Sequence, residues 1–434
     1  MMSLIFNPEL RRNLWLEFSP ARLIAMPAVL FMVLLLAWTW GKDEGMAIAA
    51  AVSGWALLVL WGTRLACDAV ISEVQGRTWD GQRLSGLGPL RMTIGKLAGG
   101  PAYAWYGGAI CLLALLGSGG IAGEPLVPIS LVVTGLFAQS VALWFGLVQL
   151  RLRSGVQRFH VTFAQIVGIA VSVQLAPFDH FFDVTVTWYG LTFDAFEFAL
   201  MSTAVFTVWA WIGCWRLMRA ELQYRSWPLF WCAFLVFLLV YFDGLSGQYF
   251  GLFSPIASLS EDEAFLWQAG GFMTVVTASW FAMLLEPKSI VRLRRLLERL
   301  GRRDFGRALG DMPVFVAGLP ILAISAVLLS LGKPEPGLIL VQAASLVLFL
   351  LRDAALVYYV VLSGSRRGHL AALVYLVLLY GIVPGILTGA DAGPLLAAFV
   401  PLAAQAPVIG LLGPGLQAAG FAFLLSTRLT RPKA

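Results

Sequence analysis

The sequence predicts an all-α polytopic membrane protein of about twelve transmembrane helices, arranged as two parallel-duplicated six-helix blocks. Three observations predict this fold. The 434 residues are 59% hydrophobic and only 12% charged, whereas soluble domains carry roughly 25% charged residues. The mean hydropathy is +0.82. Apolar stretches of span length recur along the chain, and one motif occurs twice.

A transmembrane helix needs about twenty apolar residues to cross roughly 30 Å of hydrocarbon. By this measure we expect spans near residues 22–40, 46–66, 98–117, 126–149, 160–176, 195–215, 228–243, 266–285, 313–331, 338–361, 370–388 and 408–426.

The loops between these spans differ in charge. Nearly all Lys and Arg residues fall on one side of the predicted membrane, and Lys42 and Lys333 are the exceptions. Cytoplasmic loops carry an excess of Lys and Arg, so we expect an integral protein of the cytoplasmic membrane with both termini in the cytoplasm. The net charge of +6 is explained by these loops and anionic lipid headgroups, and it does not indicate nucleic-acid binding.

The repeated motif is S-G-x-x-R-x-H. It precedes the fifth and the eleventh predicted spans, and its residues are Ser154, Gly155, Arg158 and His160 in the first copy and Ser363, Gly364, Arg367 and His369 in the second. An even number of spans separates the copies, so both have the same orientation. We therefore expect one block over residues 1–215 and another over residues 216–434. The histidines could form a proton or metal site, but turns at the membrane interface are favoured, since no Cys or carboxylate lies at ligand spacing.

The loop between the second and third spans, residues 68–96, is unusually charged. Each Arg, Lys or Asp would cost roughly +2.5 to +3.5 kcal/mol in hydrocarbon, so the loop must face water or protein. Its apolar spacing, with Gly86, Gly88 and Pro89 between two stripes, predicts two short amphipathic helices joined by a turn. We expect Glu73 and Asp80 to face water.

This loop resembles a motif of the type 2 ATP-binding-cassette exporter permeases, E-x-x-x-G-T-x-E-x-L-x-x-x-P followed by G-K. The residues that match in order are Glu73, Thr78, Asp80, Leu84, Pro89, Gly95 and Lys96, while Arg77 stands where the family usually has glycine. The alternative is a generic amphipathic cytoplasmic loop. The resemblance implies a six-span permease that works as a dimer, here fused into one chain, with ATPase-coupling residues Glu73, Arg77, Thr78, Asp80, Arg83, Pro89 and Lys96.

The second block carries its own basic loop between equivalent spans. Residues 288–307 place leucines on one face and arginines, among them Arg292, Arg295 and Arg299, on the rest. Such a helix binds anionic inner-leaflet lipids or docks on a partner, and we expect it to contact the second ATPase copy.

No sequence of the form G-x-x-x-x-G-K-[ST] occurs, so the chain has no phosphate-binding loop. The resemblance therefore implies that ATP and Mg are bound by a separate ATPase, and that this chain is no enzyme and holds no cofactor. Two alternatives remain. A twelve-span secondary carrier fits the span count equally well, and a membrane-bound transferase is weakened by the lack of a His/Asp cluster.

Further expectations concern charges and breaks within the apolar regions. Arg64 and Arg352 should reach the cytoplasmic face, and Arg352 should pair with a carboxylate from a neighbouring helix; structural roles are favoured over functional ones. The segments 177–193 and 389–410 should form paired short outer helices, since the family has such helices there. The four cysteines lie in or beside spans, so we expect no disulfides.

Overall fold

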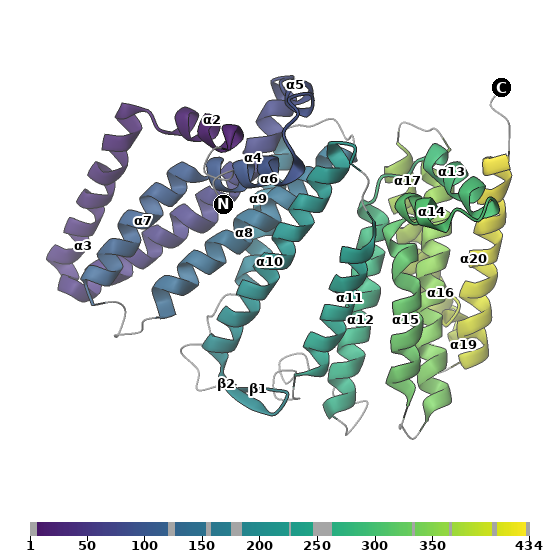
Figure 1. Ribbon diagram of the computed structural model, residues 1–434. Helices are drawn as coiled ribbons and strands as arrows, with labels where there is room; N and C mark the ends of the chain where they lie inside the picture. Colours follow the sequence, from purple (N-terminus) through teal and green to yellow (C-terminus); the bar gives the residue numbers. More distant parts are fainter. Residues whose placement is uncertain are drawn as a thin grey trace. The chain divides into compact units, whose positions relative to one another are not determined.

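The computed structural model describes residues 7–119, 126–152, 158–174, 185–224, 227–245, 263–331, 335–363, 367–401 and 406–430. These residues are almost entirely helical, with a single two-stranded hairpin (Figure 1). The chain divides into two compact units. Unit 1 comprises residues 1–186 and 192–226, and unit 2 comprises residues 187–191 and 227–434.

Unit 1 contains the first half of the predicted spans. Its helices are α2 (Pro8–Glu17), α3 (Pro20–Trp55), the π-helix η1 (Ala56–Trp61), α4 (Gly62–Gln75), α5 (Trp79–Arg83), α6 (Pro89–Gly99), α7 (Ala102–Gly117), α8 (Leu126–Arg151), α9 (Arg158–Gln174) and α10 (Ala195–Glu221).

Unit 2 contains the second half. Its helices are α11 (Leu229–Asp243), α12 (Glu263–Leu285), α13 (Ile290–Gly301), α14 (Phe305–Asp311), α15 (Val314–Ser330), α16 (Pro336–Val361), α17 (Gly368–Val377), the π-helix η5 (Leu378–Ile382), α18 (Val383–Gly389), α19 (Gly393–Leu396) and α20 (Pro407–Thr430).

Each of the twelve predicted spans falls largely on helix where the structure describes its residues. Seven helical stretches within the described ranges are long and apolar enough to cross a membrane, and two bent pairs, α6 with α7 and α14 with α15, bring the number to nine. Helices α9 and α11 have shorter apolar stretches. The protein is therefore an all-α polytopic protein with several membrane-spanning helices, and the count of twelve and the duplication stay predictions.

The first candidate span, residues 20–75, contains a sharp break. Lys42 adopts φ 51° and ψ −136°, which reverses the helix direction (Figure 1). Gly45 is needed at this turn, because a Cβ there would lie 2.6 Å from the carbonyl oxygen of Ala37. Both parts of the broken helix exceed the roughly twenty residues that a span needs, so the break accommodates the first two predicted spans.

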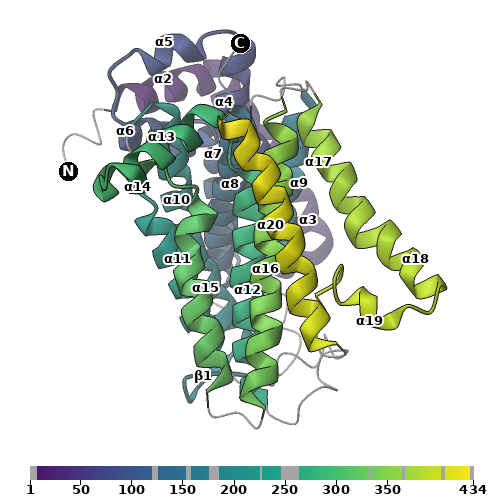
Figure 2. The ribbon, with the colours of Figure 1, turned by 90° about the vertical axis from the view of Figure 1, so that its right-hand side faces the viewer.

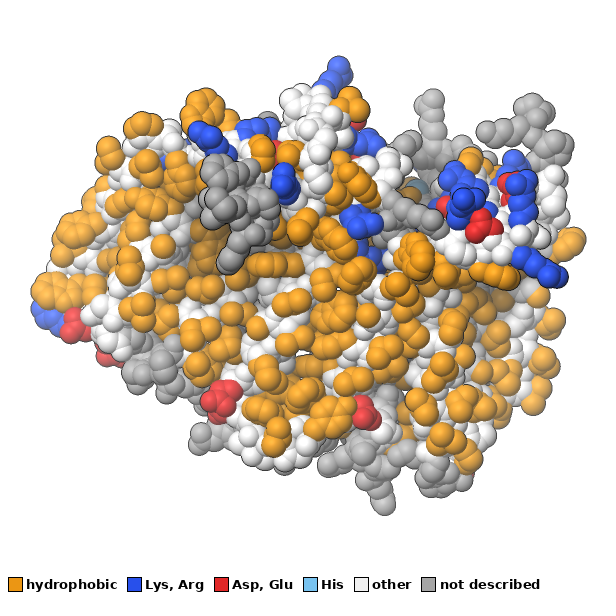
Figure 3. Space-filling view, viewed as in Figure 1, with side chains coloured by type: hydrophobic (Ala, Val, Ile, Leu, Met, Phe, Trp, Pro, Cys, Tyr) orange, Lys and Arg blue, Asp and Glu red, His pale blue; other side chains and the backbone are white. Residues whose placement is uncertain are grey.

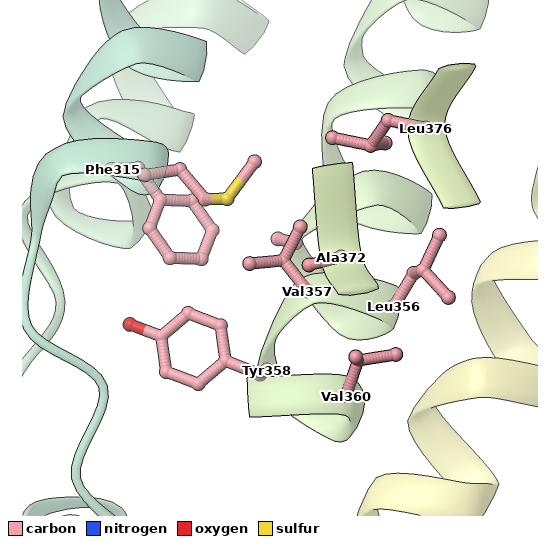
Figure 4. Packing of buried hydrophobic residues seen from close by; sticks show 9 residues of the cluster. Phe315, Leu356, Val357, Tyr358, Val360, Ala372 and Leu376 are labelled. Carbon is pink, nitrogen blue, oxygen red and sulfur yellow. The ribbon is translucent and has the colours of Figure 1, made fainter. Parts of the chain in front are cut away.

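The core of each unit is apolar and lies between helices. In unit 2, Phe315 from α15 packs on Tyr358 and Val357 from α16, and Ala372 and Leu376 from α17 cover the other side (Figure 4). Helix α18 leads into the short α19, which turns back toward α20 (Figure 2). The outer faces of the long helices are also apolar, with Phe31 and Leu36 of α3 more than half exposed, as lipid-facing surfaces require.

The predicted outer helices are wrong in the first unit. The described part of that segment forms β1 (Thr185–Trp188) and β2 (Leu191–Asp194). The turn residues Tyr189 and Gly190 both have positive φ, 48° and 80°, which is the backbone of a tight type I′ hairpin turn. Residues 177–184 lie outside the described residues. In the second unit, the corresponding segment contains the short helix α19.

The hairpin contacts the second unit, and the boundary between the two units along the chain lies near the end of α10. The hairpin tip belongs with unit 2, where Tyr189 Oη donates to the carbonyl oxygen of Val240 over 2.9 Å. The chain passes to unit 2 after residue 226, whereas the predicted boundary at residue 215 lies inside α10. Helix α10 extends beyond the predicted span as far as Glu221, with Leu222 as its C-cap.

Candidate functional site

The charged loop of unit 1, residues 68–96, contains the short helix α5 between the end of α4 and the start of α6. Helix α4 ends at Gln75 with Gly76 as its C-cap. The next residue, Arg77, has φ 57°, and the N–H groups of Arg77 and Thr78 donate to the carbonyls of Val74 and Glu73. This is a Schellman C-cap, which glycine ordinarily completes. Helix α5 follows, and α6 begins at Pro89. Arg77, the residue with left-handed backbone, therefore stands at the position where the exporter motif usually has glycine.

Four charged side chains lie beneath this loop. Lys96 of α6 has no exposed surface, and its Nζ lies 2.7 Å from Oε1 of Glu9 and also pairs with Glu73. Arg12 pairs with Glu73 as well, and its Nη2 lies 3.1 Å from Oε1 of Glu9. The network therefore joins α2, the end of α4 and the middle of α6. Two cations and two carboxylates balance, which offsets the cost of burying Lys96, Glu9 and Glu73, while the Arg12 side chain stays 40% exposed.

Close helix packing places this network. Helix α2 begins at Pro8 after Asn7, whose side chain accepts from the N–H of Glu9 and donates to the carbonyl of Arg91. A Cβ at Gly95 would lie 2.5 Å from Cγ of Glu9. Only glycine allows α2 to approach α6 so closely, so this contact brings Glu9 within reach of Lys96.

Helix α5 is fixed to the same network. Gln82 donates to Oε1 of Glu73 over 2.6 Å. Trp79 is 4% exposed, its ring lies 5.9 Å from the ammonium of Lys96, and its Nε1 donates to Glu221 of α10 over 3.4 Å. The projecting helix is thus attached to α4, α6 and α10 through buried polar contacts.

The outer side of α5 faces solvent. The side chain of Asp80 is 88% exposed, and Leu84 is 86% exposed. The expectation that Glu73 also faces water is wrong, because its side chain is 10% exposed and pairs with two cations. Of the predicted coupling residues, Asp80 lies on the outer surface, whereas Glu73 and Lys96 support that surface from beneath.

The remaining predicted residues of this loop have separate positions. Thr78 Oγ1 donates to the carbonyl of Glu73 over 3.2 Å, so it belongs to the cap. Arg83 Nη1 lies 3.7 Å from Oε1 of Glu221. Pro89 is the first residue of α6, where its missing N–H costs nothing.

The basic loop of unit 2 is also built around buried carboxylates. Glu286, at the end of α12, is 7% exposed in its side chain and pairs with Arg292 over 2.5 Å, and its other oxygen accepts from the N–H of Val314. Arg299 pairs with Asp311. Arg292 and Arg299 therefore hold the loop together, whereas Arg295 is exposed. Figure 3 shows the basic side chains over α13 and α14, and a second group over the α4–α6 region of unit 1.

Lys288 lies beside this loop, outside the candidate span that ends at Leu285. Burial lowers its pKa to about 8, although the Glu286 carboxylate opposes this shift. Its Nζ donates to the carbonyl of Leu284 over 2.6 Å. This lysine therefore titrates near the upper end of the physiological range.

The repeated motif lies at two helix starts. Arg158 begins α9 and Arg367 is the N-cap of α17, so His160 and His369 lie in first turns. Ser154, Gly155 and Gly364 lie outside the described residues, and Ser363 follows the end of α16. Among the described residues, no three His, Cys, Asp or Glu side chains gather as a metal site.

A buried polar cluster within the helices of unit 2 was only partly expected. Arg352 and Asp353 of α16 have no exposed side-chain surface and pair with each other over 2.8 Å. The expected partner on a neighbouring helix is therefore wrong. Trp280 and Tyr380 donate to Oδ2 of Asp353 over 2.9 and 2.7 Å, and Arg352 donates to Gln417.

Both π-helices are associated with polar side chains. Tyr380 belongs to η5, and in unit 1 Gln139 and Gln165 donate to the carbonyls of Leu58 and Leu60 in η1. A π-helix shifts backbone carbonyls out of the usual i→i−4 pattern, and these amides satisfy them. Apolar periodicity gives no signal for this arrangement.

Comparison of the chain with protein-family models, with curated proteins and with solved structures found no match.

Proposed function

We propose that this chain is the membrane-spanning subunit of an ATP-driven exporter, similar to the type 2 ATP-binding-cassette permeases. It moves a substrate of lipid-like or apolar character across the cytoplasmic membrane, with both of its termini in the cytoplasm. A separate ATPase, in two copies, binds ATP and Mg. The single observation that carries the proposal is the structure of the α5 loop. Its outer side, at Asp80, is exposed, and its base is held by the buried ion pair of Glu73 and Lys96.

Such a loop is suited to transmit movement. A partner that closes on nucleotide moves a permease only through an element that it contacts in the cytoplasm and that is attached rigidly to the spans. Gln82 of α5 and Lys96 of α6 both contact Glu73 at the end of α4. A displacement of α5 would therefore act on the helices on both of its flanks, and through Arg12 on α2 as well.

The basic loop over α13 and α14 has the corresponding role in unit 2. Its arginines Arg292 and Arg299 stabilise the loop internally, which leaves Arg295 and the exposed Leu297 for a partner or for anionic lipids. Charges at a docking surface set the choice of partner.

The alternative is a secondary carrier, and one observation favours it. Asp353 is a buried carboxylate within a candidate span, and buried carboxylates often serve proton coupling. Yet both of its oxygens are already paired, with Arg352, Trp280 and Tyr380. A structural role is the simpler account of this group.

The test is purification of the tagged chain from native membranes in a mild detergent. The exporter account expects a distinct ATPase polypeptide to co-purify, and the Asp80→Lys variant to lose it. Asp43 is also exposed, and the charge asymmetry predicts it on the opposite side, so Asp43→Lys is the matched control and should keep the ATPase. If all three preparations lack an ATPase and transport is abolished by ionophores, the carrier account replaces this one.

A further inference from the structure

A cavity lies in unit 1 where the beginning of α6 meets the end of α10. Its volume is about 540 Å³, within the range of sites that bind small molecules. Helix α6 contributes the first-turn residues Gly88 to Arg91, and the end of α10 contributes Trp215, Arg219 and, just beyond it, Tyr224. The coupling loop does not use this cavity.

The charged groups around the cavity favour an anion. Arg91 and Arg219 both line it, and the guanidinium of Arg219 lies 5.0 Å from the ring centroid of Trp215. The nearby carboxylate, Glu221, accepts from Trp79 and pairs with Arg83, so it is directed to the α5 loop. Arginine binds phosphate with two parallel hydrogen bonds and is favoured at such sites.

The backbone groups at the start of α6 and at the end of α10 also favour an anion in the cavity. The N-cap residue of α6 is Gly88, which has no side chain to cap the helix, so the first N–H groups of α6 keep their partial positive charge. Carbonyls at the end of α10 are partly satisfied, since the N–H groups of Gln223 and Tyr224 donate to the carbonyls of Ala220 and Arg219. The cavity therefore has donors at α6 and few free acceptors at α10.

The remaining walls are apolar and amphipathic. Leu90, Pro89 and Trp215 form them, and Leu90 and Tyr224 are about half exposed. Helix α10 is a candidate span over Ala195–Glu221, so the cavity lies where an apolar helix ends. Tryptophan and tyrosine are enriched at this depth of a membrane, beside the headgroups.

We propose that this cavity binds the phosphate headgroup of an anionic phospholipid from the surrounding leaflet. Arg91 and Arg219 hold the phosphate, and Leu90 and Trp215 contact the glycerol and the start of the acyl chains. Basic pockets between helices at a membrane surface bind lipid headgroups in this way. The proposal does not depend on the exporter function, because it requires only that this end of unit 1 lies at the membrane surface.

The test is native mass spectrometry of the detergent-purified full chain, titrated with dioleoyl phosphatidylglycerol. The pocket variant is Arg91→Gln with Arg219→Gln. The matched control is Arg11→Gln with Arg302→Gln, which removes the same charge from exposed positions. Thermal unfolding of each variant establishes that both are folded.

We expect the pocket variant to bind the anionic lipid at least about tenfold more weakly, given roughly 1 kcal/mol per basic residue near a membrane surface, and the control to bind as the original chain does. Phosphatidylcholine should bind much more weakly to all three. Equal losses in both variants would mean general surface attraction and would overturn the site. The proposal would also be overturned if the pocket variant bound the anionic lipid as tightly as the original chain, or if glycerol phosphate bound as tightly as the lipid. If the double variant fails to fold, Arg91→Gln alone, at an exposed position, carries the same comparison.

Discussion

The ammonium of Lys96 lies between the carboxylates of Glu73 and Glu9, 2.7 Å from Oε1 of Glu9, with no exposed surface. Glu73 lies in the last turn of α4, the helix before the α5 loop, and Lys96 belongs to α6, the helix after it. The pair therefore closes the base of the loop, and α2 completes the closure through Glu9 and Arg12.

Loss of one partner should destabilise this base strongly. Glu73→Gln leaves Lys96 and Arg12 with one carboxylate, and breaking a buried pair costs about 3–5 kcal/mol. We expect thermal unfolding in detergent at a clearly lower temperature, and substantial recovery when Lys96→Met is combined with Glu73→Gln. A single variant as stable as the original chain would contradict the buried network.

Charge reversal at the outer side of the loop should leave the fold intact. Asp80 is 88% exposed, and substitutions at such positions usually change stability within about 0.5 kcal/mol. Asp80→Lys should therefore unfold at the same temperature as the original chain, whereas Glu73→Lys, which adds a third cation beside Lys96 and Arg12, should not accumulate as folded protein. If Asp80→Lys and Glu73→Lys unfolded at similar temperatures, the assignment of Asp80 to the exposed side and of Glu73 to the buried network would be contradicted.

Glycine at the end of α4 should stabilise the chain. Arg77 has φ 57°, a conformation that costs roughly 1 kcal/mol for a residue with a Cβ and nothing for glycine. Arg77→Gly should raise the free energy of unfolding by up to about 1 kcal/mol, and Arg77→Ala, which keeps the Cβ, should not. Denaturant unfolding of the two variants distinguishes relief of backbone strain from loss of the arginine charge, which would affect both equally.

The position of the long apolar helices was predictable because bilayer thickness sets the length of an apolar run. The network at Lys96 was not, since Glu9 and Arg12 lie far from Glu73 in the sequence and meet it only where Gly95 lets α2 approach α6. An amphipathic pattern alone placed Glu73 in water. The hairpin at Tyr189 was missed because four-residue strands carry too little alternation to compete with an expectation of helix. Arg352 was expected to pair across helices, yet its neighbour Asp353 supplies the charge.

The buried pair in α16 should be structural. Asp353→Asn removes the charge opposite Arg352 and weakens the hydrogen bonds from Trp280 and Tyr380, so we expect a loss of about 3–5 kcal/mol. The combination of Arg352→Met with Asp353→Leu should recover much of it, as measured by thermal unfolding. A functional charge would show the reverse pattern, with stable single variants that fail in transport.

The stability of the chain should depend on pH through Lys288. Its pKa is lowered to about 8 in the folded chain and is about 10.4 when unfolded. Between these values the unfolded state binds more protons, so stability contributed by this group rises with pH across that window. Lys288→Met should gain more stability at pH 7 than at pH 10, compared with the original chain by thermal unfolding at each pH. If Lys288→Met changed the stability by the same amount at pH 7 and at pH 10, the lowered pKa of Lys288 would be contradicted.

The central claim, that the outer side of α5 is the docking surface for an ATPase, is tested most directly by site-specific photocrosslinking in intact cells. A photoreactive amino acid replaces Asp80 in one variant and Asp43 in the other; Asp43 is also exposed and is predicted on the opposite side of the membrane. We predict an adduct between position 80 and an ATPase polypeptide, identified by mass spectrometry, and none from position 43. Full-length, folded protein that forms no ATPase adduct at position 80 would contradict the account.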